Sequence, residues 1–177
     1  MAVSGGSTAP ALFGALAIMT VPWGSVGIWQ VDERVAPDGD ADRNAPQLGA
    51  LGGRHHLMSV TDDDLLAAAA RYGASLPERF DVVHLGMGDD GHTASWPPGD
   101  PVIDNPAPVA LSRPYQGRVR MTLTPPVVNR AGGRVVLTTG AAKAGALSAW
   151  LRVGEGPIAR LRPAGTVVFA DAAAVGR

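Results

Sequence analysis

Apolar residues in this chain fall in short continuous runs that alternate with longer segments of mixed polarity. Short runs rich in β-branched residues and sharply bounded are typical of strands buried on both faces. Four runs fit this pattern: 26–31, 81–86, 134–139 and 166–170. Residues 118–123 alternate instead, which predicts a strand with one face exposed to solvent.

Helices are predicted at 7–18, 61–75 and 141–151. The second is expected to start with Thr61 as N-cap and acidic residues in its first turn. Strands alternating with helices predict an α/β fold with a mostly parallel sheet flanked by helices. The length and the lack of repeats predict a single domain over residues 1–177.

Two long polar or Pro-rich stretches, 35–53 and 96–117, are predicted to be surface loops. They follow predicted strands, and α/β proteins place their binding sites in loops at strand ends. Candidate site residues are therefore expected at the carboxyl ends of the predicted strands.

The composition excludes several classes of function. Hydrophobic residues make up 46% of the chain, charged residues make up 18%, and the net charge is −1, with scattered arginines. This is not the pattern of a nucleic-acid or membrane-surface binder. No apolar run approaches the roughly 20 residues of a membrane span, and the start resembles no signal peptide. Without cysteine, disulfides and thiolate nucleophiles are excluded, and we expect a cytoplasmic protein.

The segment Ser4–Thr8 is the first candidate site. Its two glycines let the backbone approach a ligand, and the N–H groups of the following helix with two hydroxyls suit a phosphate. An ordinary glycine turn with a serine N-cap is the alternative interpretation. Asp32–Arg34 forms the second candidate, three charges at a strand end where Arg34 could clamp an anion, although a solvated strand end would also account for them.

The segment Leu85–Ser95 carries the most specific signal. Its glycines and aspartates predict a tight loop that presents His92, with Asp90 near enough to orient the imidazole, so that His92 could take a proton from water. His84 and the pair His55–His56 are interpreted as structural. Lys143, the only lysine, is predicted in the first turn of a helix, where an anionic ligand would account for it and a solvated side chain is the alternative.

No metal or cofactor is predicted. Asp38–Asp42 matches the opening of a calcium loop, but Arg43 and Gly49 stand where that loop needs Gly and Glu. Histidines and carboxylates do not cluster at ligand spacing. A nucleophilic serine is not supported because G-x-S-x-G is absent.

Taken in order, these segments resemble the 6-phosphogluconolactonase family, with its GGST, a strand ending in DER, LGxGxDGHTAS, RxTLT and a later G-x-x-K. The resemblance implies a Rossmann-like fold, here N-terminally shortened because the family usually has a helix and strand before GGST. It implies that Gly6, Ser7, Thr8, Arg34 and Lys143 hold the phosphate and ring of a phosphorylated sugar lactone. His92 would activate water, with Asp90 as its partner.

Two alternatives share this fold: a sugar-phosphate isomerase or deaminase, and a sensor domain that binds sugar phosphates without catalysis. Deaminases typically continue with Phe-Asn-Glu-Pro, whereas this chain has no acid in Ala94–Gly99, and no DNA-binding segment is visible. The resemblance thus implies a metal-free hydrolase of the pentose phosphate pathway. We expect no nucleic-acid or membrane partner, and the oligomeric state stays open, with a monomer favoured by a small margin.

Overall fold

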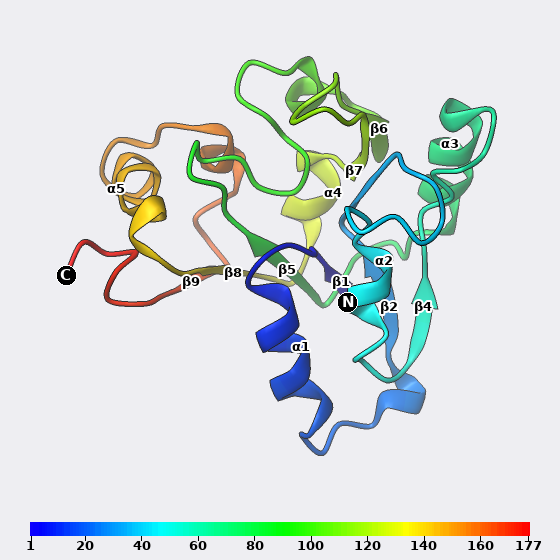
Figure 1. Ribbon diagram of the computed structural model, residues 1–177, viewed down its shortest axis with the longest axis horizontal. Helices are drawn as coiled ribbons and strands as arrows, with labels where there is room; N and C mark the ends of the chain where they lie inside the picture. The colour runs from blue at the N-terminus through cyan, green and yellow to red at the C-terminus, as the bar shows by residue number, and fades with distance from the viewer.

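A computed structural model describes residues 1–177 as two sheets with helices around them (Figure 1). The six-stranded sheet has the order β4-β2-β1-β5-β8-β9, and all of its strand pairs are parallel. Its strands are β1 (Ala2–Val3), β2 (Gly27–Gln30), β4 (Arg54–His56), β5 (Val82–Gly86), β8 (Gly133–Thr138) and β9 (Thr166–Ala170). The predicted α/β class with a mostly parallel sheet is confirmed.

A smaller antiparallel sheet has the order β3-β7-β6, from β3 (Asp32–Arg34), β7 (Arg120–Leu123) and β6 (Val109–Leu111). The α-helices are α1 (Ala9–Ala17), α2 (Ala45–Leu48), α3 (Leu65–Ser75), α4 (Pro125–Arg130) and α5 (Ala144–Val153). Short 3₁₀ turns are η1 (Trp23–Ser25), η2 (Pro101–Asp104), η3 (Ala141–Lys143) and η4 (Pro157–Arg160). None of the helices is both long and apolar enough to span a bilayer.

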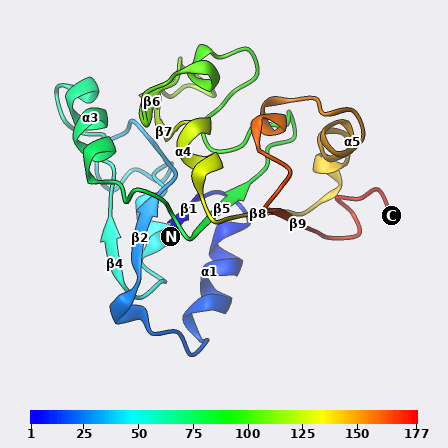
Figure 2. The same cartoon turned by 180° about the vertical axis from the view of Figure 1, so that it is seen from behind.

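The main core lies between the parallel sheet and the elements on one side of it. Figures 1 and 2 show α1 on one side of the sheet and α3, α4 and the small sheet on the other. The larger cluster of buried apolar residues joins Leu85 and Val136 of the parallel sheet to Met121 of the small sheet. A smaller cluster holds α1 and α2 against the opposite face through Phe13 and Leu48.

Four local predictions are wrong. No residue of β9 is buried, so the run 166–170 forms an edge strand rather than a strand buried on both faces. Every residue of β7 is buried, so this strand has no solvent-exposed face, because β3 and β6 flank it within the core. Helix α3 starts at Leu65 rather than near Thr61, and the Asp64 side chain accepts the Ala67 N–H at 2.9 Å. The predicted loops also contain short elements, α2 in the first stretch and η2 and β6 in the second.

Candidate active site

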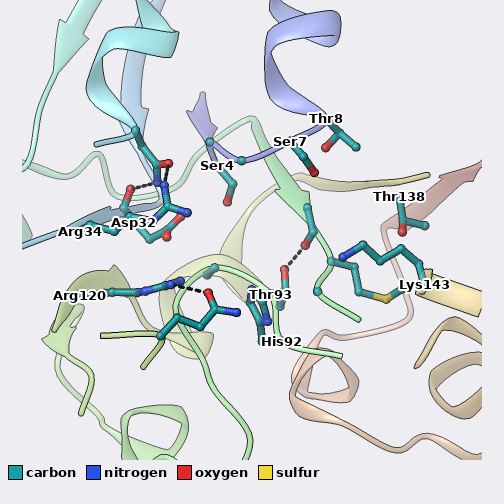
Figure 3. Close-up of a pocket in the computed structure, with 18 of the residues that line it drawn as sticks. Ser4, Ser7, Thr8, Asp32, Arg34, His92, Thr93, Arg120, Thr138 and Lys143 are labelled. Atoms are coloured by element: carbon teal, nitrogen blue, oxygen red, sulfur yellow. Dashed lines mark hydrogen bonds between the residues drawn. The ribbon is translucent and has the colours of Figure 1, made fainter. Parts of the chain in front are cut away.

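The carboxyl ends of β1, β5 and β8 meet the end of the small sheet at a polar cleft of about 200 Å³. This is the place where open α/β sheets bind ligands. Figure 3 shows Asp32, Arg34 and Arg120 on one side of the cleft, and Ser7, Thr8, Thr138 and Lys143 on the other, with His92 and Thr93 between them. Six of the seven predicted site residues line it: Gly6, Ser7, Thr8, Arg34, His92 and Lys143.

The turn after β1 presents backbone and hydroxyl groups to the cleft. Gly6 has φ +109°, a conformation that glycine adopts without the cost of a Cβ, and its N–H donates to Gln47 Oε1 at 3.0 Å. Thr8 is the N-cap of α1, but its side chain makes no capping hydrogen bond. Its hydroxyl, that of Ser7 and the positive end of the helix are therefore available to an anion.

The loop after β5 holds His92 by its backbone and by its ring. The Gly88 N–H donates to the His92 carbonyl at 2.8 Å, and Gly91 has φ +79°. The Thr93 hydroxyl donates to the Gly86 carbonyl at 2.8 Å. These contacts fold the loop back onto the strand end, as the glycine pattern predicted.

Asp90, the seventh predicted residue, lies behind His92 rather than in the cleft wall. Its Oδ1 lies 2.6 Å from His92 Nδ1, and its Oδ2 accepts the Tyr115 hydroxyl at 2.6 Å. Partial burial opposes ionisation, but hydrogen bonds from Tyr115 and His92 outweigh it and lower the pKa of Asp90. An ionised Asp90 can only accept, so Nδ1 donates and Nε2 is left to accept a proton.

Tyr115 completes this arrangement. Burial and the neighbouring Asp90 carboxylate raise the pKa of Tyr115 to about 12, so the phenol stays protonated and donates to Asp90. Its ring meets the His92 ring edge to face, with centroids 5.3 Å apart. Tyr115 was not predicted as a site residue, because nothing in the local pattern of its loop links it to His92, 23 positions earlier.

Asp32–Arg34 is a strand inside the molecule and not a solvated strand end. Glu33 is fully buried, where it accepts the N–H groups of Asn44 and Ala45 and pairs with Arg43 at 3.2 Å. Its role is to tie the following loop to β3. Asp32 lines the cleft and accepts the Ser95 hydroxyl at 2.7 Å.

Arg34 reaches the cleft from this strand. Its guanidinium donates to the Asp42 carbonyl at 2.8 Å and to Asn44 Oδ1. Gln116 and Arg120 also line the cleft, and neither was named as a site residue from sequence. The signal for Arg120 was present, since this residue opens the RxTLT segment.

Lys143 reaches the cleft from the opposite side. It is the last residue of η3 and the N-cap residue of α5. The α-helix therefore begins just after Lys143, whereas the sequence pattern predicted Lys143 inside its first turn. The preceding Gly140 has φ +92°, and its N–H donates to the Asp171 carboxylate at 3.0 and 3.1 Å. Figure 3 shows the Lys143 side chain extending past Thr138 into the cleft.

The histidines interpreted as structural do not line the cleft. His84 is buried against Phe13, and burial lowers its pKa to about 4, so it stays neutral. His56 stacks on Trp29 with ring centroids 3.8 Å apart, and His55 Nε2 lies 3.0 Å from the Leu51 carbonyl oxygen. These contacts support the structural interpretation.

Comparison with known proteins adds independent information. A family model described as glucosamine-6-phosphate isomerases/6-phosphogluconolactonase matches residues 1–170. The chain is 37% identical to the human GDH/6PGL endoplasmic bifunctional protein over 89% of this chain and 23% of that protein. It is 32% identical to a 6-phosphogluconolactonase of Caulobacter vibrioides, over 80% of this chain and 69% of that one.

A solved structure shows the same fold. The 6-phosphogluconolactonase of Thermotoga maritima superposes with a TM-score of 0.86 at 24% identity, covering 96% of this chain and 83% of that one. The human bifunctional protein is much longer, so the chain spans about a quarter of its length. On the match over residues 1–170 and these similarities, the chain belongs to the glucosamine-6-phosphate isomerase/6-phosphogluconolactonase family.

Proposed function

We propose that this chain hydrolyses 6-phospho-D-glucono-1,5-lactone to 6-phospho-D-gluconate, a step of the oxidative pentose phosphate pathway. The observation that carries the proposal is the His92–Asp90 pair, with Nε2 free to accept a proton, in a cleft that has cationic side chains on two sides. Relatives named 6-phosphogluconolactonase, such as that of Caulobacter vibrioides, support the same reaction.

His92 acts as general base in this mechanism. Nε2 takes a proton from water while the water oxygen bonds to C1 of the lactone, and the carbonyl becomes an oxyanion. When the oxyanion collapses, the bond from C1 to the ring oxygen breaks, and that oxygen takes the proton back from His92. The acid formed at C1 then releases its remaining proton to solvent, so water and lactone give the carboxylate and one proton.

Asp90 serves the base in two ways. It fixes the tautomer in which Nε2 is free, and its charge stabilises the imidazolium that forms during attack. Gly6, Ser7, Thr8 and Lys143 hold the phosphate, where helix N–H groups, hydroxyls and an ammonium combine. Arg34 contacts the ring from the other side of the cleft.

Hydrolysis is preferred to deamination because the segment after His92 brings no carboxylate to the cleft. Trp96 is fully buried, and Asp100 accepts the N–H groups of Val102 and Arg113. We propose a cytoplasmic enzyme that takes a phosphorylated sugar lactone, needs no metal or cofactor and binds neither nucleic acid nor a membrane.

A direct assay tests the proposal. Purified protein should accelerate hydrolysis of the lactone above its spontaneous rate, with the same rate before and after treatment with a chelator. Glucosamine 6-phosphate offered as an alternative substrate should release no ammonia. Equal lactone hydrolysis with and without folded protein would count against the lactonase, and ammonia release would favour the deaminase.

A further inference from the structure

Two arginines of the small sheet lie opposite each other, and neither forms an ion pair. Arg34 of β3 and Arg120 of β7 are directly opposite in the antiparallel register, where like charges are destabilising. Neither guanidinium makes an ion pair with a carboxylate. Such an unfavourable placement of like charges is found chiefly at functional sites, and here an anionic ligand would compensate the two positive charges.

Arg120 is the more deeply buried of the two, with 4% of its surface exposed. It donates to Gln116 Oε1 at 3.0 Å, and its Nε–H has no partner. Burial, and then the charge of Arg34, lower the pKa of Arg120 by more than the Asp32 and Asp42 carboxylates raise it. Holding this cation in place costs free energy that an anion in the cleft would recover.

The unpartnered donor is part of a wider pattern in the cleft. Four buried polar atoms in its lining have no hydrogen-bond partner: Ser4 Oγ, Arg34 Nε, Arg120 Nε and Thr138 Oγ1. Buried polar groups are nearly always paired, so such a concentration indicates a polar ligand that bonds to them. Figure 3 shows the arginines on one side of the cleft, Thr138 on the other and Ser4 between them, so a ligand that bonds to all of these groups must have polar groups at both ends.

Tyr115 places Arg120 beside the catalytic base. The Arg120 guanidinium carbon lies 5.0 Å from the Tyr115 ring centroid, and the His92 ring packs against the same tyrosine. Lys143, Ser7 and Thr8 lie on the far side of the cleft (Figure 3). A lactone whose phosphate is at Lys143 and whose carbonyl is at His92 thus brings its carbonyl end toward Arg120.

We propose that the Arg120 guanidinium binds the lactone carbonyl oxygen as it becomes an oxyanion, and then the carboxylate of the product. This inference rests on the proposed function. Water adds to C1 with its proton passing to His92, and the electron pair of the broken C=O π bond moves to the oxygen that faces Arg120. Gln116 Oε1 accepts a hydrogen bond from Nη2 of Arg120, which leaves the Arg120 Nε–H for the lactone oxygen.

Binding of the product separates Arg120 from the phosphate site. We would titrate protein with 6-phosphogluconate and with glucitol 6-phosphate, which has CH₂OH in place of the carboxylate. Wild-type protein should bind 6-phosphogluconate roughly tenfold to a hundredfold more tightly, the range of a charge-assisted hydrogen bond. Arg120→Gln should bind the two ligands equally, whereas Lys143→Gln should weaken both and keep their ratio.

Controls make the outcome decisive. Arg113→Gln changes an exposed arginine outside the cleft and should bind as wild type does. Arg120→Lys keeps the positive charge but loses the planar guanidinium, so its ratio of affinities for the two ligands should fall between those of wild type and Arg120→Gln. If the glutamine variant does not fold, the lysine variant provides the test. In the hydrolysis assay, Arg120→Gln should lower kcat roughly 100- to 1000-fold.

Three results would overturn the inference: equal weakening of both ligands by Arg120→Gln, which would make Arg120 a phosphate ligand; an unchanged ratio in the folded Arg120 variants; or no preference in wild type. The titrations need no turnover. If the protein shows the predicted binding pattern but does not hydrolyse the lactone, the carboxylate site stands and the proposed function is wrong. If the protein hydrolyses the lactone but lacks the binding pattern, the proposed function stands and the role of Arg120 is wrong.

Discussion

At the scale of single residues, the candidate site depends on how tightly the loop around His92 is packed. The sequence predicted the loop, the histidine and its aspartate because a short segment dense in glycine and aspartate favours a tight turn over a helix or a strand. Tyr115 and Arg120 could not be predicted in the same way, since their roles depend on strand register and on contacts between distant segments.

Gly88→Ala tests this packing. A Cβ on Gly88 would lie 2.1 Å from His92 Nδ1 and 2.7 Å from Asp90 Oδ1, so the imidazole must move although the backbone of Gly88 is unstrained. Displacing a catalytic group by about 1 Å can cost on the order of 100-fold, so steady-state kinetics should show a kcat loss of that size with KM little changed. Gly14→Ala, with open space around its Cβ, is the matched control, and equal kcat in both variants would contradict the packing argument.

Tyr115→Phe tests the coupling between Tyr115 and Asp90 through pH. The folded-state pKa of Asp90 is below its ordinary value, so its stabilising contribution is present above roughly pH 4 and is lost as pH falls through the folded pKa. Removing the hydroxyl should raise that pKa toward the ordinary value. Thermal denaturation against pH should show a wild-type advantage that is largest above roughly pH 4 and narrows below it; an advantage constant with pH would argue against the coupling.

At the scale of elements, β2, β5, β8 and β9 were predictable as strands because their apolar runs are short and continuous. The run of β9 also predicted burial on both faces, which this edge strand does not have. In the small antiparallel sheet β7 was predicted as a strand but β3 was not, because β3 follows β2 after one residue and its three charged residues look like a solvated strand end. Glu33 could be buried there only because distant backbone N–H groups and Arg43 satisfy it. Those partners are a property of the folded chain and leave no local pattern.

The start of α3 gives a test at this scale. Asp64→Ala removes the side chain that accepts the Ala67 N–H, and loss of such a cap typically costs about 0.5–2 kcal/mol in the free energy of unfolding. Thr61→Ala, at the cap position that the sequence pattern predicted, should change the free energy of unfolding by less than about 0.5 kcal/mol. Urea denaturation of both variants checks this, and the reverse order would place the start of the helix at Thr61.

At the scale of the whole molecule, the cleft is assembled from segments far apart in the sequence that the fold brings to one edge. The resemblance of ordered motifs predicted most of its lining, but not which cations lie on which side. That division depends on how the small sheet packs against the parallel one. The packing also leaves Val167 and Phe169 of the edge strand β9 52% and 56% exposed.

We propose that the two sheets form one domain, as the chain length predicted. They share one apolar cluster, so neither keeps its core when the other unfolds. Unfolding in urea followed by far-ultraviolet circular dichroism and by tryptophan fluorescence should give coincident transitions. Two separated transitions would divide the molecule into independent units.

The central claim is that His92 performs the chemistry while Lys143 binds the phosphate. The most direct test is the rate of hydrolysis of 6-phosphogluconolactone and of unphosphorylated gluconolactone by wild type, His92→Ala and Lys143→Ala. Loss of a general base should slow whatever turnover each lactone shows, by about 10²–10⁴-fold. Loss of Lys143 should lower kcat/KM roughly ten- to a hundredfold for the phosphorylated lactone alone. Full activity of a folded His92→Ala protein would contradict the mechanism.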